Sequence, residues 1–216
     1  MDSSLSKLSQ LQRDLLREFF ARERAFFLTG GAALAGFYLG ERETEDLDFF
    51  SPPGADLDQA ERALSAAAAA CGGEDRIERS SPDFRRHRVR RGAESSLVDL
   101  LIDRAPMLEP EKREIDGIRI DSLREIAANK ICTLVGRNET KDLRDLRALL
   151  EQPGIDLRAA IADASVKEAG ADAGTLAWVL ETFPPPAGEP EPLQRFRAEL
   201  AKRLRLLEFE RATARD

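Results

Sequence analysis

Residues 26–50 read FFLTGGAALAGFYLGERETEDLDFF, and this stretch decides the fold. Its apolar start, Phe26 to Leu28, predicts a short buried strand that is punctuated by the glycine pair Gly30-Gly31. Residues 32–39 predict a helix ended by Gly40, and residues 47–50 predict a second strand. The stretch therefore predicts a strand–helix–strand unit with a glycine turn after its first strand.

Two acids, Asp46 and Asp48, stand where the second strand begins. Side chains alternate between the two faces of a strand, so both carboxylates project to the same side, about 7 Å apart. Such a pair repels unless a cation lies close by. Magnesium prefers oxygen ligands and usually takes one or two carboxylates plus substrate phosphates. The spacing predicts a site for Mg²⁺ or Mn²⁺ of the kind that phosphoryl-type transfer requires.

A third acid, Asp99, lies within the otherwise apolar segment 96–102. A buried carboxylate is costly unless it is paired, hydrogen-bonded or bound to a metal. Asp99 is therefore a candidate third metal ligand, or the base that activates an acceptor hydroxyl. The alternative is a strand-end charge or a structural salt bridge.

The glycine turn offers a place for phosphate, because a backbone without side chains can approach an anion closely. N–H groups at the start of the following helix would then point at the anion, and Thr44 could add a hydroxyl. These features predict nucleotide binding by Gly30, Gly31 and Thr44. The alternative is a tight turn without a ligand.

The remaining sequence predicts a mixed domain followed by a helical one. Leucines from Leu5 to Leu15 and Phe19 recur at helical spacing, so the chain opens with an amphipathic helix. Further strands are predicted over Arg76–Arg79, Phe84–Arg91, Ser96–Ile102 and Glu114–Ile120, the last a hairpin turning at Asp116-Gly117. Helices are predicted over Leu57–Ala70, Lys141–Glu151, Asp156–Glu168, Ala173–Thr182 and Pro192–Ala212. We expect an α+β fold, with a small mixed sheet packed on helices in residues 1–121 and a helical domain in residues 122–216.

Composition narrows the function. The 216 residues are 42% apolar and carry a net charge of −7, so any nucleic-acid partner must be held by a local basic patch. With two cysteines and one histidine, a zinc site built from Cys and His is not expected. We expect a cytoplasmic protein without a signal peptide or membrane span.

The basic patch is the segment 84–91, FRRHRVRR. Its functional interpretation is an electropositive rim for RNA or a nucleotide phosphate. The interpretation favoured by the sequence is a solvated edge strand whose charges discourage aggregation. His87 is expected at the surface, and no nucleophile-elbow pattern indicates a serine hydrolase.

The ordered set of motifs resembles the nucleotidyltransferase superfamily, and more narrowly its AbiEii/AbiGii-type toxin branch. That branch has a Gly-Gly turn, then an Arg and a small hydroxyl residue ahead of an Asp-Leu-Asp-Phe strand. It continues with a helical lysine, an arginine, and a basic-Asp pair followed three residues later by another Asp. The matching residues here are Gly30, Gly31, Arg42, Thr44, Asp46, Leu47, Asp48, Phe49, Lys130, Arg137, Lys141, Asp142 and Asp145. Thr44 and Lys141 replace the branch's usual Ser and Arg, which are chemically close.

The resemblance implies that Lys130 contacts the triphosphate and that Asp142 lies near the active site in a structural or catalytic role. Residue chemistry adds that Lys130 falls on an apolar helix face, where a lysine must reach a partner or snorkel outward. For Asp142 and Asp145 the alternative is a pair of surface ion pairs with Lys141 and Arg144.

The predicted activity is metal-dependent transfer of NMP from an NTP to an acceptor hydroxyl, an EC 2.7.7 type of reaction. By resemblance, the acceptor is an RNA such as the 3′ end of a tRNA, and the chain is the toxin of a bacterial toxin–antitoxin or abortive-infection system with a cognate antitoxin. One alternative is a noncatalytic nucleotide-binding or scaffold module of the same fold. Another is a dinucleotide-binding protein, although the glycines lack the Gly-x-Gly-x-x-Gly spacing.

Overall fold

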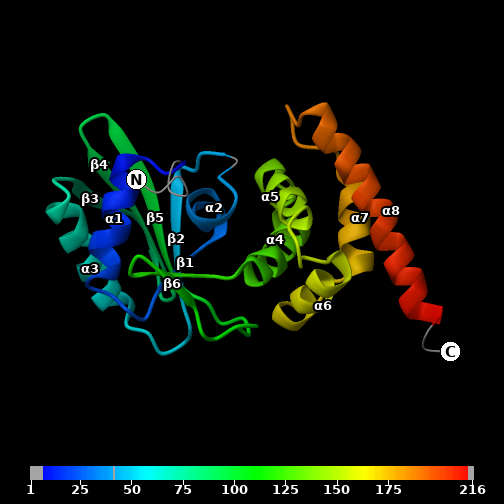
Figure 1. Ribbon diagram of the computed structural model, residues 1–216, viewed down its shortest axis with the longest axis horizontal. Coiled ribbons are helices and arrows are strands. Elements are labelled where there is room, and N and C mark those ends of the chain that lie inside the picture. Colours follow the sequence, from blue (N-terminus) through cyan, green and yellow to red (C-terminus); the bar gives the residue numbers. More distant parts are fainter. Residues whose placement is uncertain (1–6, 41, 214–216) are drawn as a thin grey trace. The chain divides into compact units, whose positions relative to one another are not determined.

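The computed structural model describes residues 7–40 and 42–213 (Figure 1). The chain divides into two compact units. The first, here called the sheet unit, contains the residues up to 104 together with 109–122. The second, the helical unit, contains residues 105–108 and the chain from 123 onward.

The sheet unit is built on one seven-stranded mixed sheet in the order β3-β4-β5-β2-β1-β7-β6. The strands are β1 (Phe27–Thr29), β2 (Asp46–Ser51), β3 (Glu74–Ser81), β4 (Phe84–Arg91), β5 (Glu94–Ile102), β6 (Arg113–Ile115) and β7 (Ile118–Ile120). The pairs β2–β5 and β1–β7 are parallel, and the other pairs are antiparallel. The expected mixed sheet packed on helices is confirmed.

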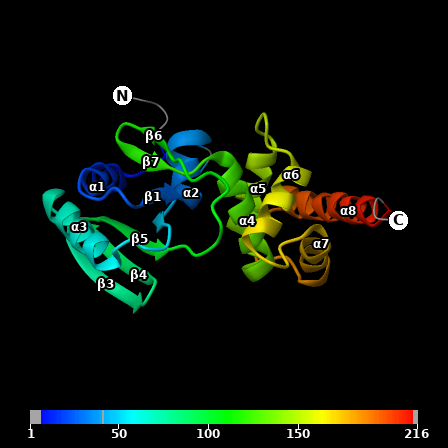
Figure 2. The ribbon, with the colours of Figure 1, turned by 90° about the horizontal axis from the view of Figure 1, so that it is seen from below.

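The helices of the sheet unit divide between the two faces of the sheet. They are α1 (Gln10–Phe20), α2 (Gly30–Ala33), the π-helical turn η2 (Leu34–Tyr38) and α3 (Leu57–Ala70). Figure 2 shows α1 and α3 against one face and α2 on the other. Phe49 of β2 is buried on the α1 side, where its ring stacks on Phe19 at 4.4 Å between centroids. Leu47 is likewise fully buried, so β2 turns Leu47 and Phe49 to the core, while its two acids and Phe50 lie on the opposite face.

Local sequence explains most element boundaries. Ser9 caps α1 reciprocally with Gln12 in a capping box; the predicted start of this helix near Leu5 lies outside the described residues. The predicted turn at Asp116-Gly117 is confirmed, with φ of 52° and 79° at its two residues. The helix predicted over 32–39 is instead one α-helical turn that starts at Gly30 and continues into the π-helical turn.

The helical unit contains α4 (Leu123–Arg137), α5 (Thr140–Leu150), α6 (Leu157–Lys167), α7 (Ala173–Thr182) and α8 (Glu191–Thr213). Its core is formed by buried leucines such as Leu134, Leu146, Leu176 and Leu200. No helix among the described residues is both long and apolar enough to cross a bilayer.

Candidate functional site

A row of four polar residues crosses four neighbouring strands of the sheet unit. Asp48 on β2 is the register partner of Thr29 on β1 and of Asp99 on β5, and Asp99 in turn is opposite Arg86 on β4. Directly opposite residues share one face of a sheet. Asp46 lies two residues before Asp48 and therefore joins the same face. The register thus brings the three predicted acids onto one surface.

The glycine turn lies directly against this row. A Cβ added at Gly30 would lie 2.3 Å from Oδ2 of Asp48, and Gly30 has a φ of +64° that other residues rarely adopt. A Cβ at Gly31 would lie 2.7 Å from Nη2 of Arg42 and 3.4 Å from Oγ1 of Thr44. The two glycines therefore allow a carboxylate and a guanidinium to approach the backbone as closely as they do.

Asp99 forms a bidentate ion pair with Arg86. Nε of Arg86 donates to Oδ1 of Asp99 at 2.8 Å, and Nη2 donates to Oδ2 at 2.6 Å. Two parallel charge-assisted hydrogen bonds of this kind fix both side chains. The structural salt bridge considered for Asp99 is therefore present, while a role as metal ligand or base stays a prediction.

The charges of all three acids act on Arg86. Its pKa is raised well above the usual value by the hydrogen bonds to Asp99, against an opposing effect of burial, and the negative charges of Asp99, Asp46 and Asp48 add to the rise. The donor chemistry of this surface, carboxylate oxygens on one face, suits a hard divalent cation. No group of three or more His, Cys, Asp or Glu side chains close enough to hold a metal occurs in the described part of the chain. Asp99 is held by Arg86, and metal binding by Asp46 and Asp48 stays a prediction.

Thr29 is a site residue that sequence reasoning missed. Its side chain is 2% exposed, and its Oγ1 is a buried oxygen without a hydrogen-bond partner among the described residues. Thr29 is the N-cap residue of α2, but its side chain makes no capping hydrogen bond to that helix. A buried hydroxyl without a partner is uncommon in native proteins, and a bound ligand or water is one physical explanation.

Arg86 was also missed, because the basic segment 84–91 was assigned to a solvated edge strand. That assignment is wrong: β4 lies between β3 and β5. The surface position expected for His87 is wrong as well, since this residue is 1% exposed and its Nδ1 lies 2.8 Å from Oδ1 of Asp75. A two-residue turn at Gly92-Ala93 pairs residue 91 with residue 94, and counting outward places Arg86 opposite Asp99. That turn was the signal available in the sequence.

The remaining predicted site residues gather in the helical unit. Nζ of Lys130 on α4 lies 2.8 Å from Oδ1 of Asp142 and 2.8 Å from Oδ2 of Asp145, both on α5. Nε of Arg137 donates to Oδ2 of Asp142 at 2.8 Å. All of these except Arg137 are buried, so a snorkelling Lys130 and surface-exposed positions for Asp142 and Asp145 are both wrong. Contact of Lys130 with a triphosphate stays a prediction.

Burial and pairing oppose each other in this cluster. Burial alone would lower the pKa of Lys130, but the charges of Asp145 and Asp142 outweigh it and the pKa is raised. Burial alone would raise the pKa of Asp142, but Lys130 and Arg137 outweigh it and the pKa is lowered. The cluster therefore holds its charged forms in spite of being removed from water.

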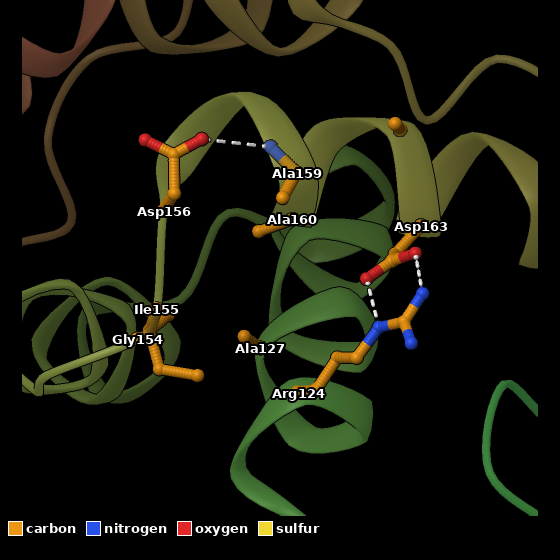
Figure 3. A pocket seen from close by; sticks show the side chains of 9 residues that line it. Arg124, Ala127, Gly154, Ile155, Asp156, Ala159, Ala160 and Asp163 are labelled. Carbon is orange, nitrogen blue, oxygen red and sulfur yellow. Dashed lines mark hydrogen bonds and ion pairs between the residues drawn. The ribbon is translucent and has the colours of Figure 1, made fainter.

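The helical unit also has a pocket of about 370 Å³ between α4 and α6 (Figure 3). Its wall includes several alanines, the loop residues Gly154 and Ile155, and the bidentate pair of Arg124 with Asp163 at 2.7 Å. Asp156 is engaged in capping α6 through the backbone N–H of Ala159. The charged groups of this pocket are already paired or engaged in helix capping. The better candidate site is the surface of the sheet unit that carries Asp46, Asp48 and Asp99, here called the acid row.

Comparison with solved structures identifies the class of the fold. A protein from H. pylori to which nucleotidyltransferase activity has been attributed matches with a TM-score of 0.61 and 21% identity, over 97% of this chain and 96% of that one. JHP933 from Helicobacter pylori matches with a TM-score of 0.52 and 20% identity, over 100% and 99%. The antibiotic-resistance factor ANT(2″)-Ia matches with a TM-score of 0.51 and 15% identity, over 72% and 88%. The fold is that of the nucleotidyltransferases.

The sequence profile of the family described as "Nucleotidyl transferase AbiEii toxin, Type IV TA system" matches residues 13–216. The chain belongs to this family, which confirms the resemblance drawn from its motifs. Family and fold together support a nucleotidyltransferase role in a toxin–antitoxin system. Comparison with curated proteins gives no match.

Proposed function

We propose that the chain transfers NMP from an NTP to an acceptor hydroxyl with the help of a divalent metal ion, Mg²⁺ or Mn²⁺. The observation that carries the proposal is the register of Asp48 with Asp99 on parallel strands, beside a glycine turn that contacts the same Asp48 carboxylate. Acids on one face beside open backbone are what a metal-bound triphosphate requires.

In this proposal Asp46 and Asp48 hold the metal ion. The ion, when bound, neutralises charge on the triphosphate and on the attacking oxygen. Asp99 is the third acid, as a further ligand or as the base that accepts the acceptor's proton. Asp46 and Asp48 are half-buried, so part of each residue faces solvent.

The triphosphate is proposed to lie along Gly30 and Gly31. The two glycines carry no side chains of their own, and Oγ1 of Thr44 lies close to Gly31. The guanidinium of Arg42 lies even closer to Gly31 and supplies positive charge to the same surface. Together these groups offer hydrogen-bond donors and a cation to phosphate oxygens.

The reaction follows from this placement. The acceptor oxygen forms a bond to the α-phosphorus, and the bond from that phosphorus to the oxygen bridging to the β-phosphate breaks. Pyrophosphate leaves with that electron pair, and the acceptor's proton passes to a carboxylate such as Asp99 or to water. Catalysis then comes mainly from positioning and charge neutralisation.

Lys130 and Asp142 are assigned by the family pattern. An ammonium has three N–H donors, and Lys130 uses two of them toward Asp142 and Asp145. We propose that the third donates to a phosphate oxygen, and that Asp142 and Asp145 hold the ammonium in the orientation this requires.

The family name supports a biological setting for the reaction. A type IV toxin–antitoxin system implies an antitoxin partner and a nucleotide substrate. We propose an RNA acceptor, with the 3′ end of a tRNA as the first candidate, and cytoplasmic action. Because the chain carries a net charge of −7, such an RNA must meet a local basic surface.

The test is incubation of the protein with each labelled NTP, Mg²⁺ or Mn²⁺ and total bacterial RNA. The native chain should transfer label to RNA, and Asp48→Ala should reduce the rate about a thousandfold or more. Asp58→Ala, which removes an exposed acid of α3, is the matched control and should keep the activity. Equal transfer by the native chain and Asp48→Ala would refute the proposal. NTP binding without transfer would favour the noncatalytic module, and binding of NAD without metal would favour a dinucleotide-binding protein.

A further inference from the structure

Arg86 is the cation of the acid row, and its position raises a question about metal stoichiometry. Both oxygens of Asp99 accept hydrogen bonds from it, at 2.8 and 2.6 Å. Phosphoryl-transfer enzymes often use two metal ions that share carboxylate ligands. An ion on Asp99 would have to displace a bidentate guanidinium, which is among the strongest hydrogen-bonded ion pairs in proteins.

The surroundings of the pair favour its retention. Asp99 is mostly buried, and the sheet register sets Arg86 directly opposite it on the antiparallel partner strand. The ring of Phe84, two residues earlier on β4, lies 5.8 Å from the guanidinium carbon. The side chain of Arg86 is thus directed by the ladder, by the carboxylate and by an aromatic neighbour at once.

We propose that Arg86 is the permanent counter-ion of Asp99 and takes the place of a second metal ion, so that the site binds a single divalent ion at Asp46 and Asp48. The inference rests on the proposed function. In this inference Asp99 holds Arg86 in position and does not coordinate a metal ion. Nη1 of Arg86 lies outside the pair and has no hydrogen-bond partner in the described part of the chain. That edge of the guanidinium remains for a phosphate oxygen.

The experiment counts bound Mn²⁺ by electron paramagnetic resonance, with the metal alone added to the full chain. We expect the native chain to bind one Mn²⁺ and Asp48→Ala to bind none. Arg86→Gln frees Asp99 and should bind a second Mn²⁺, and the double variant Arg86→Gln/Asp99→Asn should return to one. Circular dichroism of each variant verifies that it is folded.

Arg88→Gln is the matched control for charge alone. Arg88 lies two residues farther along β4 on the same face, where its Nε donates to Glu78 at 2.5 Å. The Arg88→Gln variant removes the same charge without freeing Asp99, so it should still bind one Mn²⁺.

The outcomes separate the inference from the proposed function. Two Mn²⁺ on the native chain, or loss of Mn²⁺ in Asp99→Asn, would make Asp99 a ligand and overturn the inference while leaving the metal-dependent reaction intact. A single Mn²⁺ on Arg86→Gln would also overturn it. No Mn²⁺ on the native chain would overturn both.

Discussion

Two clusters in which a cation meets carboxylates, Arg86 with Asp99 and Lys130 with Asp142 and Asp145, differ in their access to water. In the sheet unit, 37% of the Arg86 side chain is exposed beside Asp99. In the helical unit, Lys130 is 8% exposed and Asp142 is fully buried. A buried cluster must be complete within the protein, because neither water nor ions can supply missing charge. A row at the surface can take counter-charge from a ligand. We therefore expect the helical cluster to contribute more to stability, whether or not Lys130 also contacts phosphate.

The largest expected effect tests whether the helical cluster is structural. Lys130→Met removes the ammonium from two buried acids and should lower the free energy of unfolding by about 3–5 kcal/mol. Arg86→Met removes a partly exposed cation, so water can partly replace it beside Asp99, and we expect a smaller loss of about 1–3 kcal/mol. Urea unfolding followed by the fluorescence of Trp178 reports on the helical unit, and circular dichroism on the whole chain. Lys141→Met, an exposed lysine of α5, is the control for Lys130. Equal losses for Lys130→Met and Arg86→Met would contradict the comparison.

The second prediction breaks the site at its glycine turn. Gly30→Ala places a methyl group on the Asp48 carboxylate and strains a positive φ, so we expect a loss of about 2 kcal/mol in stability together with most of the activity. Gly72→Ala has a similar φ of +70° but meets nothing within 4 Å. It should therefore cost about 1 kcal/mol and keep the rate of label transfer. If both variants kept full activity, the contact between Gly30 and Asp48 would be irrelevant to function.

The third prediction concerns acid and the helical cluster. The pKa of Asp142 in the folded chain is lowered below its unfolded value of about 3.9. Its contribution to stability is therefore fully present above about pH 4 and is lost as the pH falls through the folded pKa. Asp142→Asn lacks this titration, so its free energy of unfolding should depend less steeply on pH below 4, by at most about 1.4 kcal/mol per pH unit. Denaturant titrations of both chains from pH 7 to pH 2.5 measure the difference, and equal slopes for the two chains would contradict the prediction.

The smallest expected effect sharpens the role of Thr29. Thr29→Val replaces a buried unpaired hydroxyl by a methyl group, so stability should stay the same or rise by about 1 kcal/mol. Label transfer should nevertheless slow about tenfold if the hydroxyl serves the substrate, and Thr29→Ser should restore it. Ser51 is another buried unpaired hydroxyl, at the far end of β2 on the opposite face. Ser51→Ala should change stability in the same direction without affecting the rate. Unchanged kinetics in Thr29→Val would exclude Thr29 from the site.

Patterns confined to one element were predictable from sequence. The bounds of α3, β4 and α7 coincide with the predicted ones, because apolar periodicity and end signals act locally. The placement of Asp46 and Asp48 on one face also followed from the period of a strand.

Features that depend on distant parts of the chain were not predictable. To predict that β4 lies inside the sheet, one must know that β3 pairs with it. Because β3 is largely exposed, its sequence shows little of the apolar alternation that marks a strand. The partners of Lys130 were missed for the same reason, since the packing of α4 against α5 decides which helix faces are buried. The turn of α2 into a π-helix has no sequence signal that we recognise.

The parallel pairing of β2 with β5 has a consequence for when the acid row can be complete. Between these strands the chain must first form α3, β3 and β4, and such non-local parallel ladders form slowly in folding. During synthesis the glycine turn and the first two acids leave the ribosome well before Asp99 does, because N-terminal segments emerge first. An unfinished chain therefore lacks a complete acid row until β5 has emerged and paired with β2.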